Sequence, residues 1–192
     1  MKKFVLFILG CLIIISGMIL AIINWSNFPE SIAVHFYANG APNGFAGKTT
    51  ALILIPVFLL FTHIFLFVCL IKEKQKEKIP IVFELLFTLL IPIISVIYDL
   101  AIFSSVYNIK LDIFLVVYGF VSIVFMICGN YIPKIEKSIP LVSRILGWVF
   151  LLSGSLMLLF TLLKLKIIVI TITIVSVITI VVIAILHEKK RS

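Results

Sequence analysis

The residues best suited to chemistry lie in a polar segment between two long apolar runs. This segment, PESIAVHFYANGAPNGFAGK from Pro29 to Lys48, supplies a histidine, His35, and an ammonium group. A nucleophilic Ser31 would share a strand face with His35 but lie about 13 Å from it at 3.3 Å per residue. That separation is too large for a nucleophile and its general base. We therefore predict no catalytic residues and no enzyme activity.

A metal site is a second chemistry to consider. The three histidines cannot converge, because His35 lies in the polar segment, His63 in the second apolar run and His187 in the C-terminal tail. A mixed site of His35 with nearby carboxylates stays open as an alternative and would indicate a membrane-embedded hydrolase. The carboxylates available to it are Glu30, Asp99 and Asp112. Metal ligands usually show tighter spacing, so we predict no metal and no other cofactor.

The polar segment is better explained as a shaped recognition surface. From Ser31 apolar and polar positions alternate, which is typical of a half-buried strand with Ile32, Val34 and Phe36 on its apolar face. Asn39-Gly40 predicts a tight turn, and Pro42-Asn43-Gly44 predicts a second one. The candidate ligand-binding residues are Trp25, Glu30, His35, Tyr37, Asn39, Gly40, Pro42, Gly44, Lys48 and, near the end of the third apolar run, Asp99.

The elements that must hold this segment are membrane helices. The chain of 192 residues is 63% hydrophobic and 12% charged, far from the composition of a soluble domain. A spanning helix needs about 20 apolar residues. The stretches that qualify are residues 4–24, 50–71, 80–103, 113–132, 145–163 and 167–186. We predict an all-α membrane protein with six transmembrane helices and a short ordered cap between the first two.

The basic residues predict the orientation of these helices. Lys and Arg divide 12 to 4 between alternate connections, and the richer side is expected to be cytoplasmic. The 12 are Lys2, Lys3, Lys72, Lys74, Lys76, Lys78, Lys134, Lys137, Arg144, Lys189, Lys190 and Arg191. Both termini are thus predicted to be cytoplasmic and the cap extracytoplasmic. The net charge of +8 follows from this topology and anionic lipid headgroups, so no nucleic-acid partner is predicted.

The same topology predicts the domain organisation. Residues 1–71 form an N-terminal two-helix unit with the extracytoplasmic loop 25–48. The charged segment 72–79 is a cytoplasmic connector, and residues 80–192 form a four-helix region.

Two stretches resemble signatures of the SdpI family of bacterial membrane proteins. The first-loop signature, in the small domain of unknown function at the front of that family, is matched by Pro29-Glu30, Val34-His35-Phe36, Asn39-Gly40, Pro42-Asn43-Gly44-Phe45 and Lys48. The second is GNYIPKIEKS at the cytoplasmic end of the fourth helix, with signature positions Gly129, Asn130, Pro133 and Lys134. The Gly-Ile-Arg-Thr-Pro-Trp-type segment that usually follows in the family is absent here.

The resemblance implies an immunity protein in the bacterial plasma membrane. SdpI-like proteins protect the producing cell from a secreted peptide toxin that damages membranes, and the prototype also signals toxin presence to a cytosolic repressor. The implied partners are the lipid bilayer, a secreted peptide toxin and a cytosolic regulator. The outer cap is where such a toxin would first meet the protein.

A small transporter or ion-coupled permease is the alternative function. Ionisable side chains at membrane depth are candidates for a transport pathway, and the chain has three, Glu84, Asp99 and His63. Pro56 and Pro92 predict kinks in the second and third helices. Such kinks can line a cavity through which a substrate passes.

Overall fold

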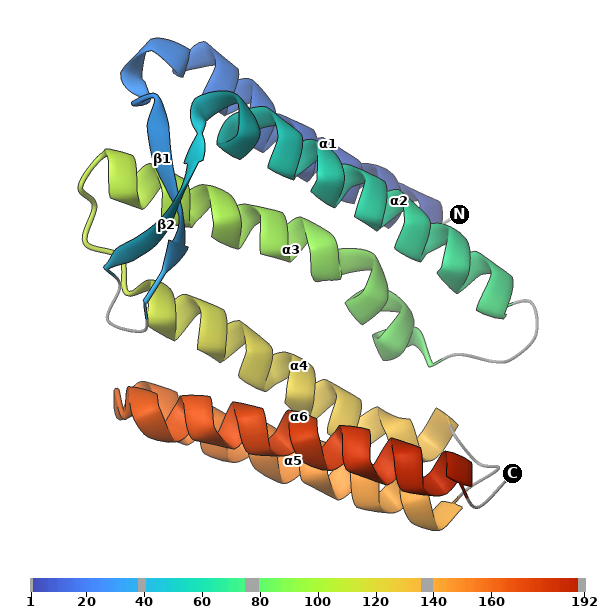
Figure 1. Cartoon of the computed structure of the whole chain (residues 1–192). Coiled ribbons are helices and arrows are strands. Elements are labelled where there is room, and N and C mark those ends of the chain that lie inside the picture. Colours follow the sequence, from blue (N-terminus) through green and yellow to red (C-terminus); the bar gives the residue numbers. More distant parts are fainter. Residues whose placement is uncertain (1, 38–40, 75–79, 136–139, 190–192) are drawn as a thin grey trace. The chain divides into compact units, whose positions relative to one another are not determined.

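The computed structural model describes residues 2–37, 41–74, 80–135 and 140–189. Its helices, each long and apolar enough to span a membrane, are α1 (Lys2–Ile23), α2 (Ile55–Lys74), α3 (Ile81–Val106), α4 (Ile113–Ile135), α5 (Pro140–Leu162) and α6 (Lys166–Lys189) (Figure 1). The prediction of six spanning helices is confirmed, and the chain is a multi-pass membrane protein. The cytoplasmic location of its ends stays a prediction.

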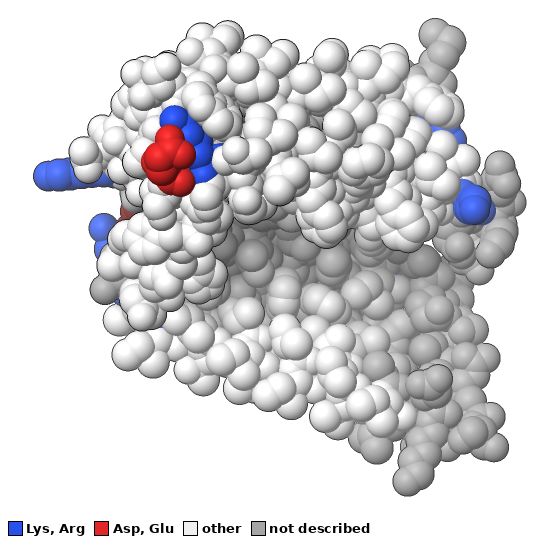
Figure 2. Space-filling view, turned by 45° about the horizontal axis from the view of Figure 1, so that its top comes forward, with Lys and Arg blue, Asp and Glu red and all other residues white. Residues whose placement is uncertain are grey.

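The outward faces of the helices suit a bilayer. Large apolar side chains cover them, among them Phe58, Phe61 and Phe65 of α2. Figure 2 shows acidic and basic side chains gathered near the ends of the molecule and almost none along the helices on that face. Apolar surface of this extent is rare on soluble monomers, so we infer that lipid covers it.

The structure divides into two compact units, Met1–Ile113 and Phe114–Ser192. In the first unit, α3 packs along both α1 and α2. The sequence predicted a boundary at residues 72–79, between a two-helix unit and a four-helix region, from membrane topology. Residues 75–79 lie outside the described part of the chain. That division therefore stays a prediction, while packing assigns α3 to the first unit.

An antiparallel hairpin joins α1 to α2 in the first unit. A short 3-10 turn, η1 (Trp25–Asn27), leads into β1 (Ser31–Phe36), which pairs with β2 (Pro42–Gly47). The Tyr37 N–H donates to the Ala41 carbonyl at 2.8 Å and closes the reversal. Asn39 and Gly40, predicted to form the turn, lie outside the described residues.

The second turn predicted at Pro42-Asn43-Gly44 is wrong, because these residues begin β2. The reason is a pair of bulges: the register shifts between Ala33 and His35 and again between His35 and Phe36. A bulge adds an unpaired residue and bends the strand, so Asn and Gly serve an irregular strand instead of a turn. Ala33 is buried beside Ile32, although strict alternation predicts it on the polar face.

A buried apolar cluster fixes the hairpin to the ends of the three helices. Its members come from α1, the link between η1 and β1, β1 itself, the start of the second helix and α3, and are Ala21, Phe28, Ile32, Ala51, Leu52 and Ile102. The Phe28 ring meets the Phe103 ring edge to face at 5.2 Å between centroids. The Tyr98 hydroxyl donates to the Ala51 carbonyl at 2.8 Å. The hairpin is therefore a packed part of the first unit.

The start of the second helix is irregular where the sequence predicts a kink at Pro56. Residues Thr50–Leu54 form one turn of π-helix, η2, before α2 begins at Ile55. Proline supplies no N–H to the preceding turn, and such wide turns often appear where the regular ladder is interrupted. Further along the chain, Pro92 lies inside α3, which is bent along its length (Figure 1).

Glycines set the packing of α4 on α5 in the second unit. A Cβ added at Gly129 would lie 2.7 Å from the Gly147 carbonyl oxygen, and one at Gly154 would lie 2.8 Å from the Ser122 carbonyl oxygen. Both distances are shorter than ordinary van der Waals contact, so the two backbones touch through glycine. Small residues permit such close approach between membrane helices. On the other side of α5, the Ser176 hydroxyl of α6 donates to the Ser153 hydroxyl at 2.7 Å.

We predict that Gly129→Ala lowers the stability of the protein in detergent by about 1–3 kcal/mol, the usual cost of overpacking. Gly119→Ala is the matched control on α4, because a Cβ there meets nothing within 4 Å. The control should be neutral or stabilise by up to about 1 kcal/mol through helix propensity. Thermal unfolding followed by circular dichroism measures both; equal midpoints for the two variants would contradict the packing role of Gly129.

Candidate functional site

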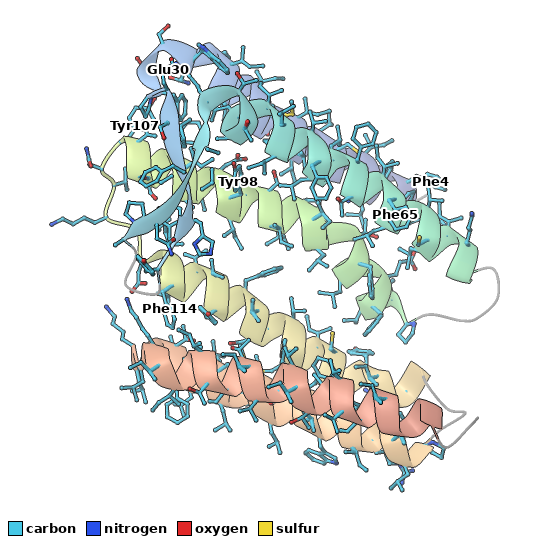
Figure 3. The ribbon with its side chains drawn as sticks, viewed as in Figure 1. Phe4, Glu30, Phe65, Tyr98, Tyr107 and Phe114 are labelled. Carbon is cyan, nitrogen blue, oxygen red and sulfur yellow. The ribbon has the colours of Figure 1, made fainter. Side chains whose placement is uncertain are left out.

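The base of the hairpin brings together three of the predicted binding residues. The Lys48 ammonium lies 5.1 Å from the centre of the Trp25 ring and 3.6 Å from a Glu30 carboxylate oxygen. The Lys48 N–H also donates to the Glu30 carbonyl at 3.0 Å. Figure 3 labels Glu30 at this end of the first unit, where β1 begins. We call Trp25, Glu30 and Lys48 the base cluster.

The members of the base cluster differ in exposure, and this decides their roles. The Lys48 side chain is 7% exposed, whereas that of Glu30 is 92% exposed. A cation over an indole ring is stabilised more strongly when water is excluded, while an ion pair with one partner in solvent contributes little. Lys48 and Trp25 therefore hold the hairpin on the helices, and Glu30 presents a carboxylate at the surface.

The outer part of the hairpin is organised around His35. Its Nδ1 atom is hydrogen-bonded to the Asn43 side-chain oxygen across the two strands. A Cβ at Gly44 would lie 2.9 Å from the His35 Cβ, so glycine makes room for the imidazole. The other ring nitrogen is available to a ligand because His35 is exposed. Two more predicted residues, Tyr37 and Pro42, are exposed on the same hairpin.

A pocket of about 460 Å³ lies beside the hairpin. It is formed by η1, both strands and the last turn of α3, and its polar lining includes Ser26, Asn27, Ser31 and Ser105. Neither this pocket nor a role for Ser26, Asn27 or Ser105 was predicted from the sequence. No signal in the sequence indicates this pocket, because it depends on the packing of α3 on β1.

Asp99 lies apart from the hairpin site, in a groove between α1 and α3. Lys48 and His35 were predicted as binding residues together with Asp99, but their side chains contact Glu30 and Asn43. Gly17 of α1 faces the Asp99 carboxylate so closely that an added Cβ would overlap it. The structure therefore separates the predicted binding residues into a hairpin group and a single carboxylate in the groove.

Further polar side chains line the inner face of the first unit. Glu84, Thr88 and Ser95 of α3 are buried, and their spacing of four and seven residues places them on one face with Asp99. His63 of α2 is 1% exposed, its Nε2 lies 3.3 Å from the Phe7 carbonyl oxygen, and its ring stacks on Phe7. Within the described part of the chain, His63 Nδ1 and Ser95 Oγ have no hydrogen-bond partner.

The second signature has a packing side and an exposed side. Gly129 and Pro133 of α4 pack against Gly147 of α5. Lys134 donates to the Asn130 side-chain oxygen at 3.2 Å, and its ammonium lies 4.6 Å from the Tyr131 ring centre. Lys134 lies in the last turn of its helix, where a cation complements the helix dipole.

No group of three or more metal-ligating side chains converges among the residues that the structure describes. For the mixed metal site considered above, the Nδ1 atom of His35 is engaged by an amide, and the Asp99 carboxylate lies in a different place.

Comparison with known proteins adds one finding. Residues 12–60 match the family described as Domain of unknown function (DUF1648). The match spans the second half of α1, the whole hairpin and the first turns of α2, and so includes the base cluster and His35. No curated protein matches the chain, and no solved structure does.

We predict that Lys48→Met loosens the hairpin, while Glu30→Gln leaves it nearly unchanged. Loss of a partly desolvated cation–π contact costs on the order of 1 kcal/mol, which corresponds to roughly fivefold more frequent opening. Hydrogen exchange of residues 31–36 and 42–47 in detergent measures this opening. Equal effects of the two substitutions would show that the exposed ion pair, not the indole contact, holds the hairpin.

Proposed function

We propose that this protein is an SdpI-like immunity protein of the bacterial plasma membrane, which protects the cell by binding a secreted, membrane-active peptide. It acts by binding, with no catalytic step and no cofactor. One observation carries the proposal: the DUF1648 match covers a hairpin that is packed on the helices yet presents exposed polar and aromatic groups. SdpI-family proteins often carry this domain, and the second signature is present in α4.

The hairpin has the properties of a peptide-binding surface. Exposed Tyr37 offers apolar area with a hydroxyl, His35 offers a ring nitrogen, and Glu30 offers a carboxylate. Aromatic residues are enriched at protein interfaces. Among the described residues each strand of the two-stranded sheet pairs on one edge only, and an extended peptide can add to the other edge through backbone hydrogen bonds. With the hairpin outside the cell, an arriving peptide meets this surface before the bilayer.

The second signature is assigned a separate role in this proposal. Asn130 and Lys134 are exposed at one end of α4. On the cytoplasmic side, they form the surface available to a cytosolic regulator that reports the presence of the toxin.

We predict that His35→Ala abolishes protection of a sensitive bacterium against the secreted peptide. A contact residue that acts as a hot spot contributes about 2 kcal/mol or more, roughly thirtyfold in affinity. Survival is measured with a panel of secreted peptide toxins at matched membrane levels of each variant. Asn43→Ala removes the hydrogen bond to His35 but keeps the imidazole, so it should weaken protection less.

Thr49→Ala is the control, because Thr49 is exposed just after the hairpin and makes no capping hydrogen bond. Protection by the wild type that persists fully in His35→Ala would reject the hairpin as the working surface. No protection by the wild type against any peptide would reject the immunity function.

A small transporter or ion-coupled permease is the second candidate function. The polar face of α3, with buried Glu84, Thr88 and Ser95, and the unpartnered nitrogen of His63 favour it. Ionisable groups inside a membrane protein commonly mark an ion or proton pathway. The hydroxyls of Thr88 and Ser95 add polar groups to the three ionisable residues that the sequence indicated, Glu84, Asp99 and His63.

We predict for this candidate that the purified protein conducts protons or small cations in vesicles under an imposed gradient, and that Asp99→Asn abolishes the flux. A pH-sensitive dye or an ion-selective electrode reports the flux. Thr49→Ala, outside the polar face, should conduct normally. A rate no higher than that of empty vesicles would reject transport.

A further inference from the structure

We propose that the groove between α1 and α3 binds a membrane-inserted peptide helix through a lysine or arginine side chain that pairs with Asp99. The groove has a volume of about 280 Å³. Its lining residues are Ile13, Ser16, Gly17 and Leu20 of α1 and Val96, Asp99, Leu100 and Phe103 of α3.

The shape of the groove fits a helix. Both sets of lining residues have the spacing i, i+3, i+4, i+7, so two turns of each helix, about 10 Å, run side by side. Ser16 and Gly17 keep the α1 wall low, which allows another helix to approach closely. Recognition of a helix in a groove uses anchors at this same spacing.

The walls of the groove determine where its ligand comes from. Leu20, Val96 and Leu100 are each about half exposed and lie on helix surfaces that lipid covers. Asp99 lies seven residues before Val106, the last residue of α3, or about 10 Å from the helix end at 1.5 Å per residue. A ligand reaches the carboxylate through the bilayer, so it must be largely apolar at this depth.

The carboxylate determines the charge of the ligand. Among the described residues Asp99 makes no hydrogen bond or ion pair. The neighbouring hydroxyls are engaged elsewhere: Ser16 donates to the Ile13 carbonyl and Tyr98 to the Ala51 carbonyl. An intramembrane carboxylate without a partner is costly, and a cationic side chain from a partner would relieve that cost.

A helix with one cationic residue satisfies all three conditions, whereas a zwitterionic lipid does not. The ammonium group of a phospholipid is tied to its phosphate at the interface, about 10 Å from Asp99 by helix geometry. A lysine on an inserted helix can lie at the depth of Asp99. The identification of that helix with the secreted peptide rests on the proposed function; the binding itself does not.

The test uses the full-length protein, labelled with a fluorescence donor, in phosphatidylcholine vesicles. The probe is a synthetic 20-residue Leu/Ala helix with one Lys seven residues from one end and an acceptor dye, and its control has Leu in place of Lys. We expect the Lys helix to bind the wild type at least tenfold more tightly than the Leu helix. Asp99→Asn, nearly isosteric, should reduce its affinity to that of the control.

Three results would overturn the proposal: equal binding of the two helices, Lys-dependent binding that persists in Asp99→Asn, and no binding to the wild type, as when a second copy of the protein fills the groove. Energy transfer between two differently labelled copies of the protein tests whether a second copy occupies the groove. Loss of that transfer in Asp99→Asn would show that it does. The assay contains neither cells nor toxin, so its failure and a failure of the survival experiment are distinguishable.

Discussion

Inside a bilayer no water is available to a free backbone N–H or C=O group, and this constraint shapes most of the chain. The spanning segments are helices even where β-branched residues dominate, as in α6. Hydroxyl side chains follow the same rule: Thr62, Ser122 and Thr179 each donate to the carbonyl four residues earlier. Pro92 departs from this rule within α3, because proline offers no N–H to the Thr88 carbonyl.

The hairpin is the largest described part of the chain outside the spanning helices. Extended backbone with unpaired edges is tolerated outside the hydrocarbon, and the hairpin lies at the ends of α1, α2 and α3 (Figure 1). Burial of Phe28 and Ile32 fixes the start of the hairpin to the helices, and the contact between Trp25 and Lys48 links the two ends of the hairpin. A surface held in this way is preorganised, which reduces the entropy lost when a partner binds.

The sequence predicted the helices well because length and hydropathy determine them, and it predicted β1 from its alternation. It failed at Pro42–Gly44, since Asn and Gly have the same local preference in a bulge as in a turn. The contacts of His35 with Asn43 and of Trp25 with Lys48 could not be predicted, because they depend on the strand register and on the path of the chain around α1. The Asp99 groove was unpredictable because it requires the contact of α1 with α3, two helices more than 50 residues apart.

The division into two units bears on how the protein is made. The elements of the first unit are contiguous in the chain, so α1, the hairpin, α2 and α3 have all been synthesised once residue 113 has been added. Domains generally fold as units during synthesis, the N-terminal one first. The hairpin can thus pack on α3 while later parts of the chain are still being translated, so its structure need not wait for the second half of the protein.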